Sequence, residues 1–168
     1  MNKTKIEPFS AVAETMAVLG SRGGLLIAGA EPVNPMTIGW GQIGIAWGKP
    51  VFLVMVRPSR FTYGLMAKAE AFSVNVPGED LARACALCGT KSGRDTDKIA
   101  ETGLALERGI ELDVPTLAGC FLHYECRIIE KSMIDPATLD GGVESSCYPE
   151  GDHHGVWWGE IVGAYRRA

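Results

Sequence analysis

The sequence has no acidic side chain between Glu31 and Glu70, although acidic residues outnumber basic ones in the chain as a whole. The formal net charge is −4. Within the acid-free stretch every charged side chain is basic: Lys49, Arg57, Arg60 and Lys68. A local excess of positive charge inside an acidic protein favours binding of a small anion. A phosphorylated cofactor is therefore the first ligand that the sequence predicts.

Long apolar runs are also absent. Runs such as residues 24–30 fall far short of the ~20 residues that cross a bilayer, and residues 1–8 contain no signal-peptide core. The five cysteines, an odd number, argue against a disulfide framework. We therefore expect a cytoplasmic protein with reduced thiols and no membrane association. The acidic pI of about 5.4 argues against a nucleic-acid partner.

Size and composition predict one domain and more than one copy of it. The chain has 168 residues, close to the ~150 residues of a typical domain. Apolar residues make up 46% of the chain and charged residues only 21%. This composition supplies more apolar surface than a soluble monomer needs to bury. We expect residues 1–168 to form a single domain that assembles as a homodimer.

Hydrophobic periodicity predicts a mainly β (α+β) fold. Helices are expected at residues 11–19, 59–69 and 79–87, with a short one starting near residue 95. Extended segments are expected at residues 25–28, 36–47, 51–57, 72–76, 104–107, 119–133 and 154–165. Residues 135–152 are expected to form an irregular polar loop. Strands joined by tight turns, with few helices, are typical of an antiparallel barrel with peripheral helices.

Two glycine-rich segments mimic nucleotide-binding motifs. Residues 39–44 (GWGQIG) match the dinucleotide fingerprint, but the following residues to Pro50 leave no room for the helix that this fingerprint requires. Residues 89–93 lack the Walker spacing. We therefore expect neither a Rossmann site nor a nucleotide triphosphatase.

The cysteines and histidines do not form a recognisable metal motif. Cys85 and Cys88 have no second pair, and on a strand His123 would point away from Cys120 and Cys126. Buried structural cysteines are the better interpretation. No metal site is predicted.

The segment after Arg57 is the best candidate for an anion site. Pro58 holds Arg57 extended, and Ser59 is expected to cap a helix that carries Arg60 and Thr62 in its first turn. Two hydroxyls, two guanidinium groups and the open N–H groups of a first helical turn suit a phosphate. The alternative is an ordinary helix cap with two solvated arginines. Thr90, Lys91 and Ser92 offer a second polar loop, or a simple connection.

Several motifs, taken in order, resemble the flavin reductase-like family and specifically its flavoredoxin-type branch. They cover nearly the whole chain, from about residue 12 to 165. They are residues 34–44 (NPMTIGWGQIG), 47–51 (WGKPV), 56–63 (VRPSRFTY), 72–75 (FSVN), 88–95 (CGTKSGRD) with Lys98, 152–154 (DHH) and 159–161 (GEI).

The resemblance implies an FMN-binding split β-barrel, an antiparallel Greek-key-like barrel that works as a homodimer. It assigns the flavin ring to Asn34, Met36, Thr37, Trp40, Gly41 and Gln42. It assigns the phosphate to Arg57, Ser59, Arg60, Thr62 and Tyr63. The other side of the cofactor is assigned to Cys88, Gly89, Thr90, Lys91, Ser92 and Lys98. His154 is expected beside the flavin or an incoming nicotinamide, as the candidate catalytic residue.

The implied function is an FMN-dependent oxidoreductase that takes hydride from NADH or NADPH and passes electrons to free flavin or a protein acceptor. Two alternatives remain open. One is an electron-transfer flavoprotein that is reduced by a redox protein partner. The other is a non-enzymatic flavin- or haem-binding module.

Overall fold

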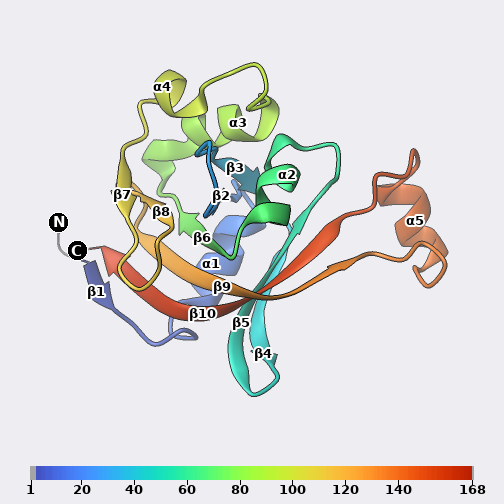
Figure 1. The fold of residues 1–168 in the computed structure, drawn as a ribbon, viewed down its shortest axis with the longest axis horizontal. Helices are drawn as coiled ribbons and strands as arrows, with labels where there is room; N and C mark the ends of the chain where they lie inside the picture. The colour runs from blue at the N-terminus through green and yellow to red at the C-terminus, as the bar shows by residue number, and fades with distance from the viewer. Residues whose placement is uncertain (1–2, 168) are drawn as a thin grey trace.

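The fold is built on a curled antiparallel sheet of eight strands (Figure 1). The computed structural model describes residues 3–167, so residues 1–2 and 168 of the predicted domain lie outside the described residues. The strand order is β3-β2-β6-β9-β10-β5-β4, and β1 pairs with β10. These strands are β1 (Lys3–Lys5), β2 (Gly24–Ala28), β3 (Met36–Ile38), β4 (Gly41–Ala46), β5 (Lys49–Val56), β6 (Ala71–Val76), β9 (Leu122–Met133) and β10 (Gly155–Arg167). A separate two-stranded sheet joins β7 (Leu106–Arg108) to β8 (Pro115–Leu117).

The helices lie around this sheet. They are α1 (Val12–Leu19), α2 (Phe61–Lys68), α3 (Ala82–Thr90), α4 (Lys98–Thr102) and α5 (Gly141–Cys147), with a 3₁₀ turn η1 (Glu79–Leu81) before α3. In Figure 1, α3 and α4 sit together at one end of the molecule, whereas α5 sits on an arm formed by the extended ends of β9 and β10.

Most predicted strands are confirmed, and so is the hairpin at residues 36–57. Strands β4 and β5 pair from Gly41 with Val54 to Ala46 with Lys49. The two turn residues, Trp47 and Gly48, both have positive φ (50° and 70°). That is the backbone of a type I′ turn, whose twist matches that of the flanking strands.

Several predicted boundaries are wrong. The segment 36–47 is two strands, because pairing breaks at residues 39–40. Helix α3 continues through Gly89 to Thr90, and α4 begins at Lys98, where the Asp97 side chain accepts a hydrogen bond from the Ala100 N–H. Residues 135–152 are not all irregular, since they contain α5. The Asp140 carboxylate caps that helix by accepting hydrogen bonds from two backbone N–H groups.

Two hydrophobic clusters hold the fold together. The larger packs α1 and α2 against the sheet and includes Phe52, Phe72 and Tyr124. The smaller lies under α3 and α4 and includes Leu25, Ile27, Cys85, Cys88 and Cys120. Burial raises the pKa of these three thiols. The prediction of buried structural cysteines is confirmed for them and for Cys126.

Within residues 3–167, no helix is long and apolar enough to cross a bilayer. The same residues contain no group of three or more His, Cys, Asp or Glu side chains placed to hold a metal ion.

A fully buried carboxylate holds the turn between β7 and β8. The Glu125 side chain is 0% exposed, and its two oxygens accept hydrogen bonds from the N–H groups of Ile110, Glu111 and Leu112 at 2.7–2.9 Å. Glu125→Gln is expected to lower the free energy of unfolding by about 1–2 kcal/mol, because the new amide N–H₂ cannot accept a hydrogen bond. Urea denaturation measures this change. The exposed Glu70→Gln is the control, and equal stabilities of the two variants would contradict the assignment.

Candidate cofactor-binding site

One cavity of about 360 Å³ lies where β3, the start of α2, the end of α3 and the start of β10 meet. That volume is within the ~300–1,000 Å³ range of small-molecule sites. Its lining residues come from segments that are distant in sequence: Met36, Thr37, Ile38, Gly39, Trp40, Met55, Val56, Arg57, Ser59, Arg60, Phe61, Thr62, Cys88, Gly89, Thr90, Lys91, Ser92, Gly93, Arg94, Lys98 and His154.

Most of the residues that the sequence assigned to the cofactor line this cavity. They are Met36, Thr37, Trp40, Arg57, Ser59, Arg60, Thr62, Cys88, Gly89, Thr90, Lys91, Ser92, Lys98 and His154. Four further residues that the sequence assigned to the cofactor do not line the cavity: Asn34, Gly41, Gln42 and Tyr63.

The residues outside the cavity have other contacts. Asn34 lies behind the wall, where its amide N–H₂ donates to Thr62 Oγ1 at 2.8 Å. Gly41 and Gln42 pair with β5, and a Cβ at Gly41 would lie only 2.9 Å from the Leu53 carbonyl oxygen. Tyr63 packs edge-on against Trp157. Their roles in cofactor binding stay predictions.

Aromatic rings form one end of the cavity. Trp40 is 43% exposed, and its ring centroid lies 4.8 Å from that of His154. The Tyr148 hydroxyl lies 2.7 Å from His154 Nδ1. The His153 ring stacks on the Tyr148 ring, and the Arg57 guanidinium lies 4.9 Å from the centroid of the Tyr148 ring.

The protonation of this aromatic end follows from burial. Burial, reinforced by the charge of Arg57, lowers the pKa of His154 to about 4, so its imidazole is neutral at pH 7. Burial also raises the pKa of Tyr148, which therefore keeps its hydroxyl proton. When the phenol donates to Nδ1, the remaining proton of the imidazole is on Nε2, and His154 then offers an N–H donor to the cavity.

Cations line much of the rest of the cavity, and Arg57 lies beside its aromatic residues. The lining contains no carboxylate. Five basic side chains line the cavity: Arg57, Arg60, Lys91, Arg94 and Lys98. Lys98 is buried and donates to the carbonyls of Pro35 and Cys88 at 3.1 and 2.9 Å. Of the four cations in the acid-free stretch, Arg57 and Arg60 line the cavity. Lys49 instead pairs with Glu160, and Lys68 lies outside the cavity, so the other three cations come from residues 91–98.

The role predicted for Ser59 as a helix cap is wrong. Helix α2 begins at Phe61, Arg60 occupies the cap position, and no side chain caps it. The Ser59 N–H and hydroxyl instead donate to the carboxylate of Asp152 at 3.0 and 2.5 Å. The charged acceptor outcompetes the cap because charge-assisted hydrogen bonds are stronger than neutral ones. The donors of Ser59 are thus already used within the protein.

Sequence reasoning did not assign Asp152, Tyr148 or Arg94 to the site. Asp152 and Arg94 lie inside motifs of the family resemblance, so that signal could have identified them. Tyr148 has no local signal, because it follows the unpredicted helix α5. Gly93 was also missed: a Cβ there would overlap Asn34 Oδ1 and the Phe61 ring.

The cavity therefore has the chemistry for both a flat ring and a phosphate. Aromatic and sulfur-containing side chains suit the ring, and uncompensated cations suit the anion. The donor set fits FMN, the cofactor that the sequence predicted.

Known proteins share this fold. Flavoredoxin from Methanosarcina acetivorans is 27% identical with a TM-score of 0.69, and the match covers 86% of this chain and 68% of that chain. The FMN-binding protein from Thermus thermophilus, solved with bound p-hydroxybenzaldehyde, is 25% identical with a TM-score of 0.68, over 86% of this chain and 71% of that one. The predicted split-barrel fold is confirmed.

Sequence comparison agrees with the structural likeness. An uncharacterized protein from Archaeoglobus fulgidus is 28% identical over 115 residues, which is 68% of this chain. The match spans 64% of that relative, less than two thirds of its length. The family model described as flavin reductase like domain matches residues 9–168. Because that match covers nearly the whole sequence, the chain belongs to the flavin reductase-like family.

Proposed function

We propose that the protein binds FMN in this cavity and acts as an NAD(P)H-dependent flavin reductase, passing electrons to free flavin or to a protein acceptor. One observation carries the proposal: a single cavity is lined by aromatic side chains and by five cations, with no carboxylate in its lining. The Thermus thermophilus neighbour, described as an FMN-binding protein, supports the choice of cofactor.

In this proposal the flavin ring lies against Met36, Thr37 and Trp40, and the phosphate lies among the cations. Bound FMN supplies the redox chemistry by accepting a hydride, with its two electrons, from the nicotinamide. The chain holds and orients the ligands, and His154 donates its Nε2 proton in a hydrogen bond to an electron-rich atom of a bound ring. The positive field of the cavity favours the more negative, reduced form of the cofactor.

Anaerobic titration tests the enzymatic proposal. Purified protein loaded with FMN is mixed with NADH or NADPH, and loss of the visible flavin absorbance is followed over time. Reduction much faster than that of the same concentration of free FMN is expected. A rate equal to that of free FMN would contradict direct use of NAD(P)H.

A second candidate is an electron-transfer flavoprotein reduced by a redox protein partner. The likeness to a flavoredoxin, at 27% identity, favours it. Rapid reduction by a reduced ferredoxin, with no reaction toward NADH or NADPH, would support this candidate over the first. If bound FMN is reduced by neither donor, the non-enzymatic flavin-binding module is the remaining interpretation.

We also propose a homodimer formed through the β4–β5 hairpin. The tip of this hairpin exposes two large apolar side chains, Ile45 (74%) and Trp47 (64%), and the Trp47 ring packs edge-on against Trp158 at 5.5 Å. Exposed apolar patches of this kind mark association surfaces. Sedimentation equilibrium measures the mass, and a monomer at micromolar concentration would contradict the proposal. A cytoplasmic location stays a prediction.

A further inference from the structure

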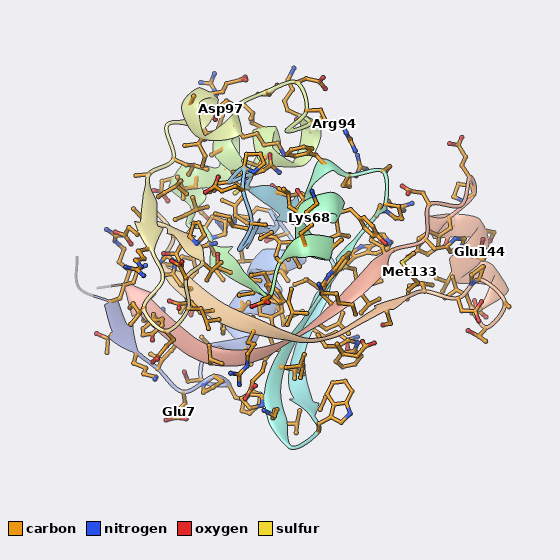
Figure 2. All side chains as sticks on the ribbon, in the orientation of Figure 1. Glu7, Lys68, Arg94, Asp97, Met133 and Glu144 are labelled. Atoms are coloured by element: carbon orange, nitrogen blue, oxygen red, sulfur yellow. The ribbon has the colours of Figure 1, made fainter. Side chains whose placement is uncertain are left out.

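The arm that carries α5 is acidic. This α5 arm comprises residues 135–153 and leaves the sheet between the end of β9 at Met133 and the start of β10 at Gly155. Figure 2 shows Met133 near its base and Glu144 farther out. The arm contains no lysine or arginine. It contains five carboxylates: Asp135, Asp140, Glu144, Glu150 and Asp152.

Two residues that line the cavity, Arg57 and Ser59, hold the arm against the barrel. The two terminal nitrogens of Arg57 donate to the carbonyl oxygens of Cys147 and Asp152, at 2.7 and 3.4 Å. The Ser59 N–H and hydroxyl donate to the two carboxylate oxygens of Asp152, at 3.0 and 2.5 Å. Donors on the wall of the cavity are therefore directed to the arm.

The Asp152 carboxylate uses donors that also suit a phosphate. A backbone N–H and a hydroxyl, with a guanidinium nearby, are the groups that bind phosphate oxygens in proteins. The sequence assigned both Ser59 and Arg57 to the phosphate for that reason. Each N–H or O–H group makes one strong hydrogen bond, so the donors of Ser59 cannot serve Asp152 and a phosphate at once.

Charge makes the two anions exclude each other further. A phosphate monoester carries about −1.5 to −2 at pH 7, more than a carboxylate. Five cations line the cavity and would attract it. A phosphate close to Ser59 would also be repelled by the carboxylate of Asp152, because like charges at short range destabilise each other. The more highly charged anion is therefore the stronger competitor for these donors.

The backbone beside this contact can turn away from it. Gly151 and Asp152 both have positive φ, 75° and 61°. Within residues 3–167, Asp152 and the hairpin residue Trp47 are the two non-glycine residues with positive φ. This conformation is uncommon for a residue with a Cβ, although aspartate tolerates it. The bonds to Ser59 offset its cost, and Gly151 allows the chain to rotate when those bonds are lost.

We propose that the Asp152 carboxylate competes with a ligand phosphate for the two donors of Ser59, so that phosphate binding releases the α5 arm. Asp152 then sets the affinity of the cavity for phosphorylated ligands. This inference rests on the proposed function, because the phosphate belongs to the FMN that the cavity binds. Riboflavin has no phosphate and leaves the arm in place.

The test compares wild type with Asp152→Asn in fluorescence titrations with FMN and with riboflavin. Asparagine has the shape of aspartate and tolerates positive φ, but it carries no charge. The matched control is Glu150→Gln, which removes one charge from an exposed side chain of the same arm. Among residues 3–167 the Glu150 side chain forms no hydrogen bond or ion pair. Thermal melting checks that each variant is folded.

The Asp152→Asn variant is expected to bind FMN about 5- to 30-fold more tightly than wild type, and riboflavin within about twofold. Glu150→Gln should stay within about twofold of wild type for both ligands, because salt screens its exposed charge. FMN affinity of Asp152→Asn that equals or falls below that of wild type would overturn the inference. An equal gain in Glu150→Gln would overturn it as well.

Hydrogen–deuterium exchange tests the release of the arm itself. In wild type, FMN should speed exchange of the backbone amides of residues 141–152, because the arm loses its bonds to the barrel. Riboflavin should leave their exchange unchanged. Equal exchange with the two ligands would contradict the release.

Failure of the proposed function has a different signature. If neither wild type nor Asp152→Asn binds FMN, the proposed function is wrong, and calorimetric titration with inorganic phosphate decides the inference. Tighter phosphate binding by Asp152→Asn would support competition. Equal phosphate affinities, or no phosphate binding by either protein, would overturn it.

Discussion

Replacing Arg60 by alanine is expected to weaken FMN binding by about 1.5–3 kcal/mol, roughly 10- to 100-fold, while riboflavin binding stays nearly unchanged. The Arg60 side chain lines the cavity and forms no ion pair among residues 3–167, so its charge is available to a phosphate. Riboflavin carries the same ring without the phosphate. The difference between the two ligands therefore isolates the contact with the anion. Equilibrium titration of flavin fluorescence measures both affinities.

The control for this experiment lies on the same helix. Lys68 ends α2, is exposed and does not line the cavity, so Lys68→Ala removes one charge from α2 without changing the site. Lys68→Ala should change the FMN affinity little, because salt screens the interaction between an exposed charge and a ligand that it does not contact. If Arg60→Ala weakened riboflavin and FMN equally, the assignment of Arg60 to the phosphate would be wrong.

Removing the Tyr148 hydroxyl is expected to change the protonation of His154. In Tyr148→Phe, Nδ1 of His154 loses its hydroxyl partner, so its pKa should rise above about 4, while burial and the charge of Arg57 keep it below its ordinary value of 6.5. In the variant, the neutral imidazole is then lost at a higher pH than in wild type. If His154 acts as a neutral donor, flavin reduction by NAD(P)H should fall by up to about twofold at pH 6 in the variant and not in wild type. FMN affinity should change little, because the phosphate contacts remain.

Tyr124→Phe is the matched control for Tyr148→Phe. The Tyr124 hydroxyl also makes a buried hydrogen bond of 2.7 Å, to Thr15, but it lies in the large core cluster and not at the cavity. Both variants lose one buried hydrogen bond, worth ~1 kcal/mol. Only Tyr148→Phe should shift the titration of His154 in ¹⁵N NMR spectra. An unchanged titration in both variants would show that Tyr148 does not set the protonation of His154.

The parts of the site that lie close together in sequence were predictable. Arg57 to Thr62 and Thr90 to Ser92 are short runs in which charge and hydroxyl content indicate an anion site. Strand alternation and turn residues likewise indicated the β4–β5 hairpin, because these signals depend on neighbours only a few residues apart.

The parts that depend on long-range contacts were not predictable from local pattern. Ser59 has a strong preference for helix caps, but Asp152, 93 residues away, provides a charged acceptor that overrides it. Helix α5 begins with two glycines, Gly141 and Gly142, which disfavour a helix, and the Asp140 cap offsets them.

The most direct test of the account is to titrate the wild-type protein with FMN and with riboflavin at low and high salt. We expect saturation at about one FMN per chain. We also expect FMN to bind at least ~30-fold more tightly than riboflavin, an advantage that shrinks as salt screens the cations. Failure to bind FMN, or equal affinities for the two flavins at low salt, would contradict the claim that this cavity binds a flavin through its phosphate.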